Sequence, residues 1–385
     1  MSEYRNNTIS EFTIKHFDTA LITFSYIHEG LRGEKIEIIY QNENAKELFP
    51  VGLTVDNEGV LSWLKRRIIP KNRMYVDALL SKIGLNHNDT IGIIRICKGL
   101  SLNDCYWVVE SNFDGKFADY NLYDNRFEKT LSLIAYTGYG SVKARGFTSS
   151  PEFTTNGMLK KAWRYKENTI TLYKGGTSGA KNTGNEPYSE FYSAQVAKAM
   201  ELDHIEYGLS MWKKNLCSTC ALFTSKDVSY VQIYDFVRIK SIYEVGEFLK
   251  TLGEDFYEDF SDMLIFDAII CNEDRHYGNF GLLVDAKTNL PIKFAPIFDN
   301  GISLFNYAMA DDIKHLDEYA KTRLSSYNIS FIEIAREYMD KKKKEKLRKL
   351  LDFKFEKHKR YNLPSKRLLA VEKFIRERSR MFLNM

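Results

Sequence analysis

The sequence predicts an α+β fold in which a strand-rich N-terminal part precedes a mostly helical C-terminal part. Three observations predict it. Apolar and polar residues alternate over 12–26 and 35–40, as they do in half-buried strands. Apolar residues recur at helical spacing over 331–338 and 368–382. Between these regions, residues 263–301 give helix, loop and hairpin signals in succession.

The most informative stretch runs from Asp267 to Gly301 and reads DAIICNEDRHYGNFGLLVDAKTNLPIKFAPIFDNG. Apolar residues at helical spacing predict a buried helix that ends near Cys271. Residues 272–279 are polar and contain a glycine, which is typical of a loop. Two short apolar runs, 281–284 and 292–295, then predict a hairpin. The hairpin leads into the sequence Asp-Asn-Gly.

Three polar side chains in this stretch suit phosphoryl transfer. Asp274 is a candidate for orienting an attacking hydroxyl and accepting its proton. Asn279 and Asp299 carry oxygen atoms of the kind that bind Mg²⁺ beside nucleotide phosphates. The competing interpretation is a charged loop in which the aspartate caps a helix. It accounts for Asp274 but not for the downstream carboxylate, so the sequence favours a kinase-type site that uses ATP and Mg²⁺.

This segment resembles the catalytic core of the HipA family of bacterial serine/threonine kinases. Its Asp-Arg-His…Asn run is also similar to that of phosphatidylinositol-3/4-kinases. The resemblance implies a bilobal, protein-kinase-like fold of HipA type, with Asp274 as catalytic base and His276 as a supporting catalytic residue. It also implies that Asn279 and Asp299 are the metal ligands. Asp-Asn-Gly stands where eukaryotic kinases have Asp-Phe-Gly, so their Phe-based switch is not expected.

A strand pattern over 170–173 ends at Lys174, and a helical pattern follows. In kinases a strand lysine contacts the nucleotide phosphates and pairs with a glutamate on the next helix. Glu190 is the predicted partner of Lys174. Glu186, which also lies near the predicted start of the helix, is the alternative.

Residues 149–161 are rich in Ser, Thr, Asn and Gly, which let backbone N–H groups approach phosphate oxygens. The resemblance implies a phosphate-binding loop here, formed by Gly157 and Lys161, with Lys160 as a neighbouring substitute. It also implies inhibitory autophosphorylation of this loop, because an added phosphate would repel those of ATP. The candidate hydroxyls are Ser149, Ser150, Thr154 and Thr155.

The run 216–223 corresponds by resemblance to the strand that enters the adenine-binding hinge. Ala221, Leu222 and Phe223 are therefore the hinge candidates. Cys217 and Cys220 lie in the same run. Since no second cysteine pair accompanies them, core packing is favoured over a zinc or redox site.

The predicted division is an N-terminal accessory module (1–130), a small ATP-covering lobe (131–225) and a large helical lobe with the catalytic loop (226–385). The N-terminus lacks an apolar signal core, no run has the length of a membrane span, and five cysteines do not suggest a disulfide framework. We therefore expect a cytoplasmic protein without a membrane span.

The chain has a net charge of +4, but the charge is uneven. Residues 341–380 contain 17 Lys and Arg against 5 Asp and Glu, a net of +12, which leaves −8 for the rest. A solvated helical face is favoured over contact with nucleic acid or an acidic partner. With no helix-turn-helix or zinc-finger pattern, no direct base-specific binding of nucleic acid is expected.

Together these observations predict an ATP-dependent serine/threonine protein kinase. The resemblance implies a protein substrate and a candidate antitoxin partner, as in a toxin–antitoxin system. Two alternatives stay open. A small-molecule or lipid kinase would use the same loop, and a nucleotide-binding pseudokinase is disfavoured because no catalytic position is missing.

Overall fold

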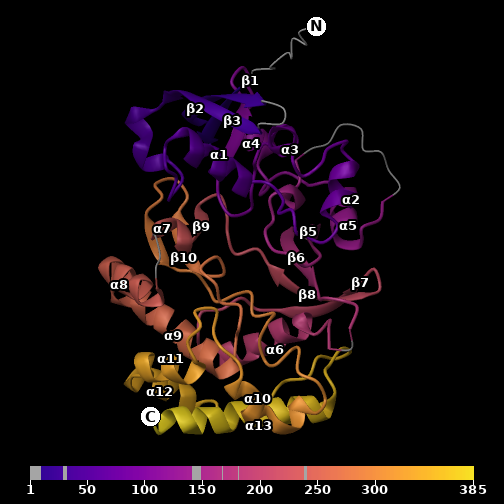
Figure 1. Ribbon diagram of the computed structural model, residues 1–385, viewed down its shortest axis with the longest axis vertical. Helices are drawn as coiled ribbons and strands as arrows, with labels where there is room; N and C mark the ends of the chain where they lie inside the picture. Colours follow the sequence, from indigo (N-terminus) through magenta and orange to yellow (C-terminus); the bar gives the residue numbers. More distant parts are fainter. Residues whose placement is uncertain (1–9, 29–32, 141–148, 167, 181, 238–240) are drawn as a thin grey trace. The chain divides into compact units, whose positions relative to one another are not determined.

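The computed structural model describes residues 10–28, 33–140, 149–166, 168–180, 182–237 and 241–385 (Figure 1). Within these ranges the chain is an α+β protein, as predicted. It divides into two compact units. Unit 1 comprises Met1–Leu172, Thr224–Val231 and Val284–Leu290, and unit 2 comprises Tyr173–Phe223, Gln232–Leu283 and Pro291–Met385. The segments 1–130, 131–225 and 226–385 are functional assignments, which this division does not test, and they stay a prediction.

Unit 1 is built on a four-stranded antiparallel sheet with the strand order β3-β2-β1-β4. Helices of the same unit cover it. Its strands are β1 (Ser10–His16), β2 (Thr19–His28), β3 (Glu34–Gln41) and β4 (Tyr106–Glu110), and its helices are η2 (Glu43–Leu48), α1 (Asn57–Arg66), α2 (Val76–Ser81), α3 (Thr90–Cys97), α4 (Phe117–Tyr120), α5 (Lys129–Thr137) and η3 (Pro151–Phe153).

The register of this sheet places apolar residues opposite one another on its buried face. Phe12 pairs with Phe24, and Ile14 pairs with Ile22, and all four are buried. They form one core with Trp63 of α1 and the apolar residues of α3. Alternation in the sequence predicted these strands correctly, because a two-residue period is the direct consequence of one buried face.

The sequence did not identify α3, β4 or α5. The segment of α3 reads TIGIIRIC, and five of its eight residues are buried, while Arg95 is exposed. A short, mostly apolar helix with a single charged residue shows no clear helical period, so its pattern cannot be told from that of a buried strand. Its N-terminus is marked instead by Asp89, whose carboxylate accepts the N–H of Gly92 at 2.8 Å.

Two further sheets occur in the described residues. One has the strand order β5-β6-β8-β7 and the other β11-β10-β9. Their strands are β5 (Lys161–Lys166), β6 (Thr169–Gly175), β7 (Gly208–Trp212), β8 (Asn215–Ala221), β9 (Val228–Gln232), β10 (Gly281–Asp285) and β11 (Pro291–Phe294). The predicted strand before Lys174 and the predicted hairpin are therefore confirmed.

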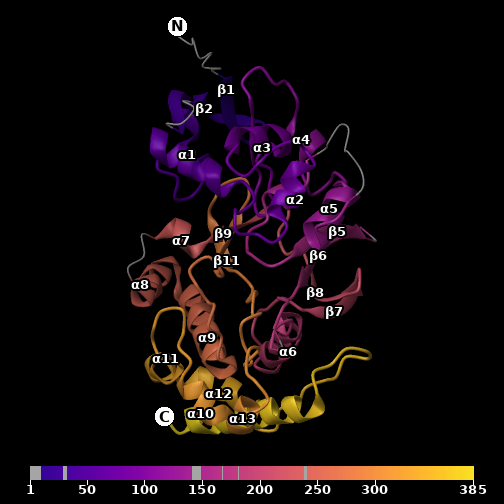
Figure 2. The same cartoon turned by 45° about the vertical axis from the view of Figure 1, so that its right-hand side comes forward.

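Unit 2 is mostly helical. The helix α9 contacts α8, α11 and α13, and Figure 2 shows α11 and α12 near its lower end. The helices are α6 (Glu186–Ala199), α7 (Ile233–Phe236), α8 (Ile242–Leu252), α9 (Glu254–Ile270), η4 (Asp312–His315), α10 (Leu316–Lys321), α11 (Phe331–Tyr338), α12 (Lys341–Arg348) and α13 (Ser365–Leu383). Ser330 and Glu333 form a capping box at the start of α11.

The helix α9 is longer than the sequence suggested. Residues 254–262, which are acidic and aromatic and precede the apolar run, are the first half of one continuous helix. From Phe260 to Ile270 every residue of α9 is buried. Glu258 and Asp262 in the first half pair with lysines from another helix, which a pattern within one segment cannot reveal.

Those lysines belong to the basic segment 341–380. Lys343 is buried and donates to Glu258 of α9 at 3.0 Å and to Asp340 at 2.7 Å. Lys346 forms an ion pair with Asp262, also on α9. Lys343 and Lys346 are thus packed against carboxylates, whereas Lys341, Lys342 and Arg348 of α12 are exposed, so the predicted solvated face describes only one side of this helix. None of the helices in the described ranges combines the length and apolar character that crossing a membrane requires.

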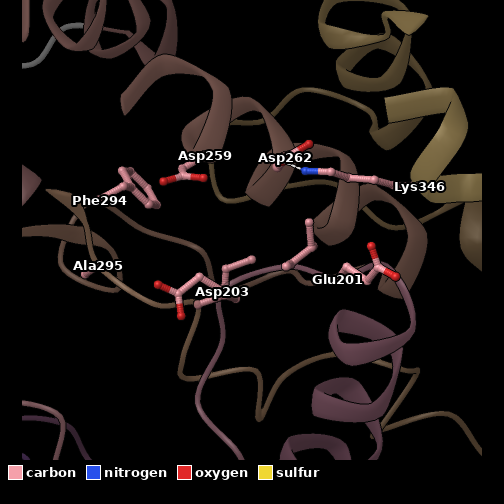
Figure 3. Close-up of a pocket in the computed structure, with 9 residues that line it drawn as sticks. Glu201, Asp203, Asp259, Asp262, Phe294, Ala295 and Lys346 are labelled. Atoms are coloured by element: carbon pink, nitrogen blue, oxygen red, sulfur yellow. Dashed lines mark hydrogen bonds and ion pairs between the residues drawn. The ribbon is translucent and has the colours of Figure 1, made fainter. Parts of the chain in front are cut away.

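Beside the Lys346–Asp262 pair lies a cavity of about 40 Å³ (Figure 3). Asp259, one turn before Asp262 on α9, lines it and makes no hydrogen bond or ion pair within the described residues. Burial raises the pKa of Asp259 to about 6, and the nearby Asp262 carboxylate adds to the effect. The ionised form of Asp259 is thus disfavoured in the folded protein.

This pKa predicts a pH-dependent stability. Between pH 4 and 6 the folded protein keeps a proton that the unfolded chain has lost, so the free energy of unfolding falls as the pH rises. Because Asp259 is partly exposed to screening solvent, Asp259→Asn should raise this free energy by only about 1 kcal/mol at pH 7.5, and Tm by about 2–4 °C. Thermal unfolding at pH 7.5 and pH 4 measures it, and an equal gain at both pH values would contradict the assignment.

Candidate active site

The C-terminal end of α9 leads directly into the loop that carries Asp274. The helix ends at Ile270, and Cys271 is left-handed with a φ of +51°. Asn272 then donates its backbone N–H and its side-chain amide to the carbonyl and the carboxylate of Asp267, both at 3.0 Å. The side-chain oxygen of Asn272 accepts the N–H of Asp274 at 3.1 Å. The helix end therefore fixes the backbone as far as Asp274.

The next residue, Arg275, is buried and joins three parts of the site. Its Nε and Nη2 donate to the two carboxylate oxygens of Asp267, at 2.8 and 3.0 Å. Its Nη1 donates to the carbonyls of Asn279 (3.1 Å) and Phe298. Its Nη2 also donates to Oδ1 of Asn300 at 2.6 Å. A guanidinium has five N–H donors, and these contacts engage all of them.

Asn279 is oriented by its own loop. Its side-chain Nδ2 donates to the backbone carbonyl of Asp274 at 2.8 Å. An amide nitrogen used in this way turns the side-chain oxygen in the opposite direction. Asn279 is therefore held with its Oδ1 presented as a ligand, which is the orientation that a metal-binding role requires.

Lys174, Glu190 and Asp299 meet in unit 2. The Nζ of Lys174 lies 2.7 Å from Oε1 of Glu190 and forms a second ion pair with Oδ1 of Asp299. The other carboxylate oxygen of Glu190 accepts the N–H of Asn300 at 2.8 Å. The choice of Glu190 as the partner of Lys174 agrees with this geometry.

Glu186 has a different environment. Its carboxylate accepts the Thr177 hydroxyl at 2.6 Å, the Thr177 N–H at 3.2 Å and the Tyr307 hydroxyl at 3.0 Å. It thus ties the glycine-containing connection after β6 to the segment that follows Asp299. The structure places Glu186 one turn of α6 away from the lysine contact.

Asp299 lies in a strained part of the backbone. Its φ is +56°, in the left-handed region that non-glycine residues rarely adopt. The Tyr207 hydroxyl accepts its N–H at 3.2 Å, and the preceding Phe298 contacts Phe223 with ring centroids 5.5 Å apart. Such backbone strain is concentrated at functional sites. The hinge candidate Phe223 therefore lies against the residue before the candidate metal ligand.

The charges in the site perturb its pKa values. Burial alone would lower the pKa of Lys174, but attraction by the carboxylates of Asp299 and Glu190 outweighs it and raises the pKa. Burial, followed by repulsion from Asp299, raises the pKa of Asp274. Lys174 therefore stays positively charged at neutral pH, and Asp274 accepts a proton more readily than an exposed carboxylate does.

Three other predicted site residues, His276, Ala221 and Leu222, make no contact with Lys174, Glu190 or Asp299 among the interactions described above. The side chain of His276 is exposed, and its Nδ1 accepts the N–H of Gly278 at 3.0 Å. Ala221 ends β8 and is exposed, and Leu222 is half-buried. For these residues the predicted catalytic and adenine-binding roles stay predictions.

Gly157 and Lys161 belong to unit 1 and lie close together there. Gly157 has a φ of +92°, and Lys161 donates through Nζ to the carbonyl of Asn156 at 2.7 Å. A Cβ atom added to Gly157 would lie 2.3 Å from this Nζ. The positive φ favours glycine at this position, and a side chain there would displace the Lys161 head group. The neighbouring Lys160 is also buried.

The donor set suits Mg²⁺. Among the described residues, no group of three or more His, Cys, Asp or Glu side chains is placed to hold a metal ion. Mg²⁺ in kinases is instead held by one or two side-chain oxygens together with nucleotide phosphates and water. An amide oxygen from Asn279 and a carboxylate from Asp299 are hard oxygen ligands of that kind, so the residues present fit the ion.

Sequence reasoning did not assign Arg275, Asp267 or Tyr207 to the site. A signal existed for Asp267, because it is a carboxylate within the apolar helical run MLIFDAII. A charge at such a position needs a buried partner, and an arginine in the adjoining loop is the natural one. No comparable signal marks Tyr207.

Comparisons with known proteins identify the fold. No family model matches the chain. A structure of the HipA, HipB and operator DNA complex of Shewanella oneidensis MR-1 contains a chain that matches over 98% of both chains, with a TM-score of 0.52 and 13% identity. The chain has the HipA-type kinase fold.

The serine/threonine-protein kinase CtkA of Helicobacter pylori is 27% identical over 34% of this chain and 43% of CtkA. The chain thus matches less than half the length of this curated relative. A crystal structure of CtkA matches 58% of the chain and 91% of its own, with 17% identity and a TM-score of 0.46. The full-length match to the HipA-type fold covers both compact units of the chain.

The contact between Lys174 and Glu190 allows a test of which glutamate of α6 supports phosphoryl transfer. Lys174→Met should lower the rate of phosphoryl transfer by about 10²-fold, because it removes a charge-assisted contact. Glu190→Gln should lower it by about tenfold, since an amide holds the lysine less strongly. Initial rates with ATP measure both effects, once thermal unfolding shows that the variants are folded.

Glu186→Gln is the matched control, because it is a buried glutamate one turn earlier on the same helix. An amide can still accept from Thr177 and Tyr307, so a small effect is expected. If Glu186→Gln were the damaging change and Glu190→Gln had no effect, Glu190 would not be the functional partner of Lys174.

Proposed function

We propose that this chain is an ATP-dependent serine/threonine protein kinase. The observation that carries the proposal is the contact of Lys174 with both Glu190 and Asp299. A lysine bridged to a helix glutamate and to the aspartate of an Asp-Asn-Gly sequence is the set of parts that kinases use. The full-length match to a HipA fold supports it.

In this proposal each side chain has a defined task. Lys174 contacts the nucleotide phosphates, and Gly157 and Lys161 do the same from their loop. Asp274 orients the acceptor hydroxyl and receives its proton on a carboxylate oxygen. The bond from the hydroxyl oxygen to the γ-phosphorus forms as the bond from that phosphorus to the β–γ bridging oxygen breaks, which releases ADP. Asn279 and Asp299 would hold Mg²⁺, which would supply positive charge beside the phosphates.

The pair of Lys174 and Asp299 also suits a site built for a nucleotide with its metal. With neither present, opposite charges at Lys174 and Asp299 neutralise one another. A phosphate attracts the lysine and a cation attracts the aspartate, so the bound substrate replaces one ion pair by two. Lys174 and Asp299 need no large rearrangement when substrate replaces their ion pair, since Glu190 keeps Lys174 in place.

The acceptor is proposed from the comparisons. The partly matching relative CtkA is named a serine/threonine-protein kinase, and the HipA structure contains HipB and operator DNA. We extend these to a protein substrate and an antitoxin partner for this chain. Incubation with radiolabelled ATP, Mg²⁺ and a cell lysate tests the acceptor class: label on protein supports the proposal, and label on lipid or small molecules alone contradicts it.

Asp299→Asn tests the metal site. Loss of the carboxylate should lower phosphoryl transfer by at least about 10³-fold, because the phosphates would lose their cation. The same protein should retain its Tm within a few degrees, since Asp299 is half-buried at the end of the hairpin. Phosphate incorporation from labelled ATP is the measurement.

A matched control is Asp311→Asn. Asp311 is exposed in the same unit and pairs only with Lys314 at the surface, so its loss should leave activity unchanged. Wild-type activity in Asp299→Asn, with the control also active, would remove Asp299 from the proposed metal site.

The proposal also includes regulation by self-phosphorylation of residues 149–155 in the candidate phosphate-binding loop. Three of its four hydroxyls make hydrogen bonds inside unit 1: Ser149 to Cys97, Thr154 to Leu100 and Thr155 to Pro151, all to backbone carbonyls. The hydroxyl of Ser150 is buried and has no hydrogen-bond partner in the described structure. Exposure of the Ser150 side chain thus breaks no hydrogen bond of its hydroxyl, and Ser150 is the favoured site.

We expect protein incubated with ATP and Mg²⁺ to gain one phosphate in this loop and to lose activity, because the added charge repels the phosphates of ATP. Peptide mass spectrometry locates the phosphate, with Asp274→Ala as the inactive control. Phosphate found only outside residues 149–155, or a modified protein with full activity, would contradict the regulatory proposal and leave the kinase proposal intact.

A further inference from the structure

Arg73 carries a guanidinium that is completely buried in unit 1. It lies in the turn before α2, within the N-terminal segment to which the sequence assigned no task. Its Nη1 donates to the carbonyl of Thr155 at 2.8 Å, and its Nη2 donates to the carbonyl of Lys161 at 2.6 Å. The next residue, Met74, donates its N–H to the carbonyl of Met158 at 2.9 Å.

These three carbonyls belong to residues 155, 158 and 161, which span the C-terminal half of the candidate phosphate-binding loop, residues 155–161. One short piece of the N-terminal segment, Arg73 with Met74, therefore holds this half of the loop from one side. The contacts are to backbone atoms, so they define the path of the loop whatever its side chains are.

The side from which the loop is held decides where its amides point. In a trans peptide unit the C=O and the N–H point in opposite directions. When the carbonyls of Thr155 and Met158 are turned toward Arg73 and Met74, the N–H groups of Asn156 and Leu159 are turned away from them. Backbone N–H groups presented together in this way form an anion-binding concavity.

Arg73 also contacts a buried carboxylate, and burying both charges costs free energy. Its Nη2 lies 3.3 Å from Oε2 of Glu152, and both side chains are fully buried. Burial raises the pKa of Glu152 to about 7 in spite of the attraction of Arg73. Glu152 is held in turn by the N–H of Trp163 (2.9 Å) and the hydroxyl of Ser132 (3.3 Å). A buried ion pair contributes little net stability, so the pair needs another explanation.

We propose that Arg73 is a positioning residue that holds residues 155–161 in the shape that receives the nucleotide phosphates. The proposal rests on the proposed kinase function and assigns a task to the N-terminal module. The module supplies the template on which the phosphate-binding loop is formed.

The test compares Arg73→Lys with the wild type. A lysine has one donor group in place of a planar fork and cannot reach both carbonyls and the carboxylate at once. The Kd for ATP with Mg²⁺ should rise about tenfold, while the Kd for adenosine, which has no phosphates, should stay within about twofold. Hydrogen exchange of the backbone amides over 155–161 should become about tenfold faster.

Arg67→Lys is the matched control. Arg67 is a buried arginine of the same segment, and it also forms an ion pair, with Asp104 at 2.7 Å, and donates to a backbone carbonyl, that of Gly99 at 2.8 Å. In the described structure its hydrogen-bond partners are Asp104 and the carbonyls of Gly99 and Tyr106, which lie outside the loop. If Arg67→Lys changed ATP affinity and loop exchange as Arg73→Lys does, a general loosening of the module would explain both, and the proposal would be overturned.

If Arg73→Lys does not fold, the double variant Arg73→Met with Glu152→Gln takes its place. It removes both buried charges together and keeps an amide oxygen to accept the N–H of Trp163. Unchanged loop exchange in a folded variant overturns the proposal, as does an equal loss of ATP and adenosine affinity. If the wild type bound neither ATP nor adenosine, both the kinase function and the phosphate-binding role of the loop would be contradicted. Hydrogen exchange over residues 155–161 would then be the measurement that decides whether Arg73 holds the loop.

Discussion

The site in unit 2 depends on the complete use of one buried guanidinium. Arg275 binds Asp267 on α9, the carbonyl of Asn279 in the catalytic loop, and Phe298 and Asn300 on either side of Asp299. Arg275 thereby links the end of a helix to two loop segments that are distant from each other in sequence. A planar fork fixes distances in two directions, which a lysine could not do. The candidate proton acceptor and the candidate metal ligands therefore share one rigid frame.

The parts of the site that the sequence could predict were local. Asp274 and Asn279 are five residues apart, and Lys174 ends a strand, so spacing and periodicity were sufficient to find them. The sequence pattern could not decide between Glu190 and Glu186, because both lie on one helix a single turn apart. The three-dimensional structure was needed to show which one contacts Lys174. The partners of Arg275 are up to 25 residues away, and no pattern along the chain connects them.

The same limit applies to the fold. Strands with one buried face and helices with a polar side were predicted because their periods are visible. The helix α3 has one exposed side chain, Arg95, among mostly buried residues, and two carboxylates in the first half of α9 are paired with lysines from the distant α12. The task of the segment before residue 130 was equally hidden, since Arg73 and its loop partners lie more than 80 residues apart in sequence.

The ion pairs between α9 and α12 change what the formal charge of the C-terminal part means. Lys343 and Lys346 each lie beside a carboxylate of α9, and Lys349 pairs with Glu201. An anion that approaches this end of the molecule meets a field of adjacent opposite charges, and such a field decays over distance much faster than that of isolated cations. The net charge of +12 over residues 341–380 therefore overstates the long-range attraction of this region for nucleic acid or for an anionic lipid surface.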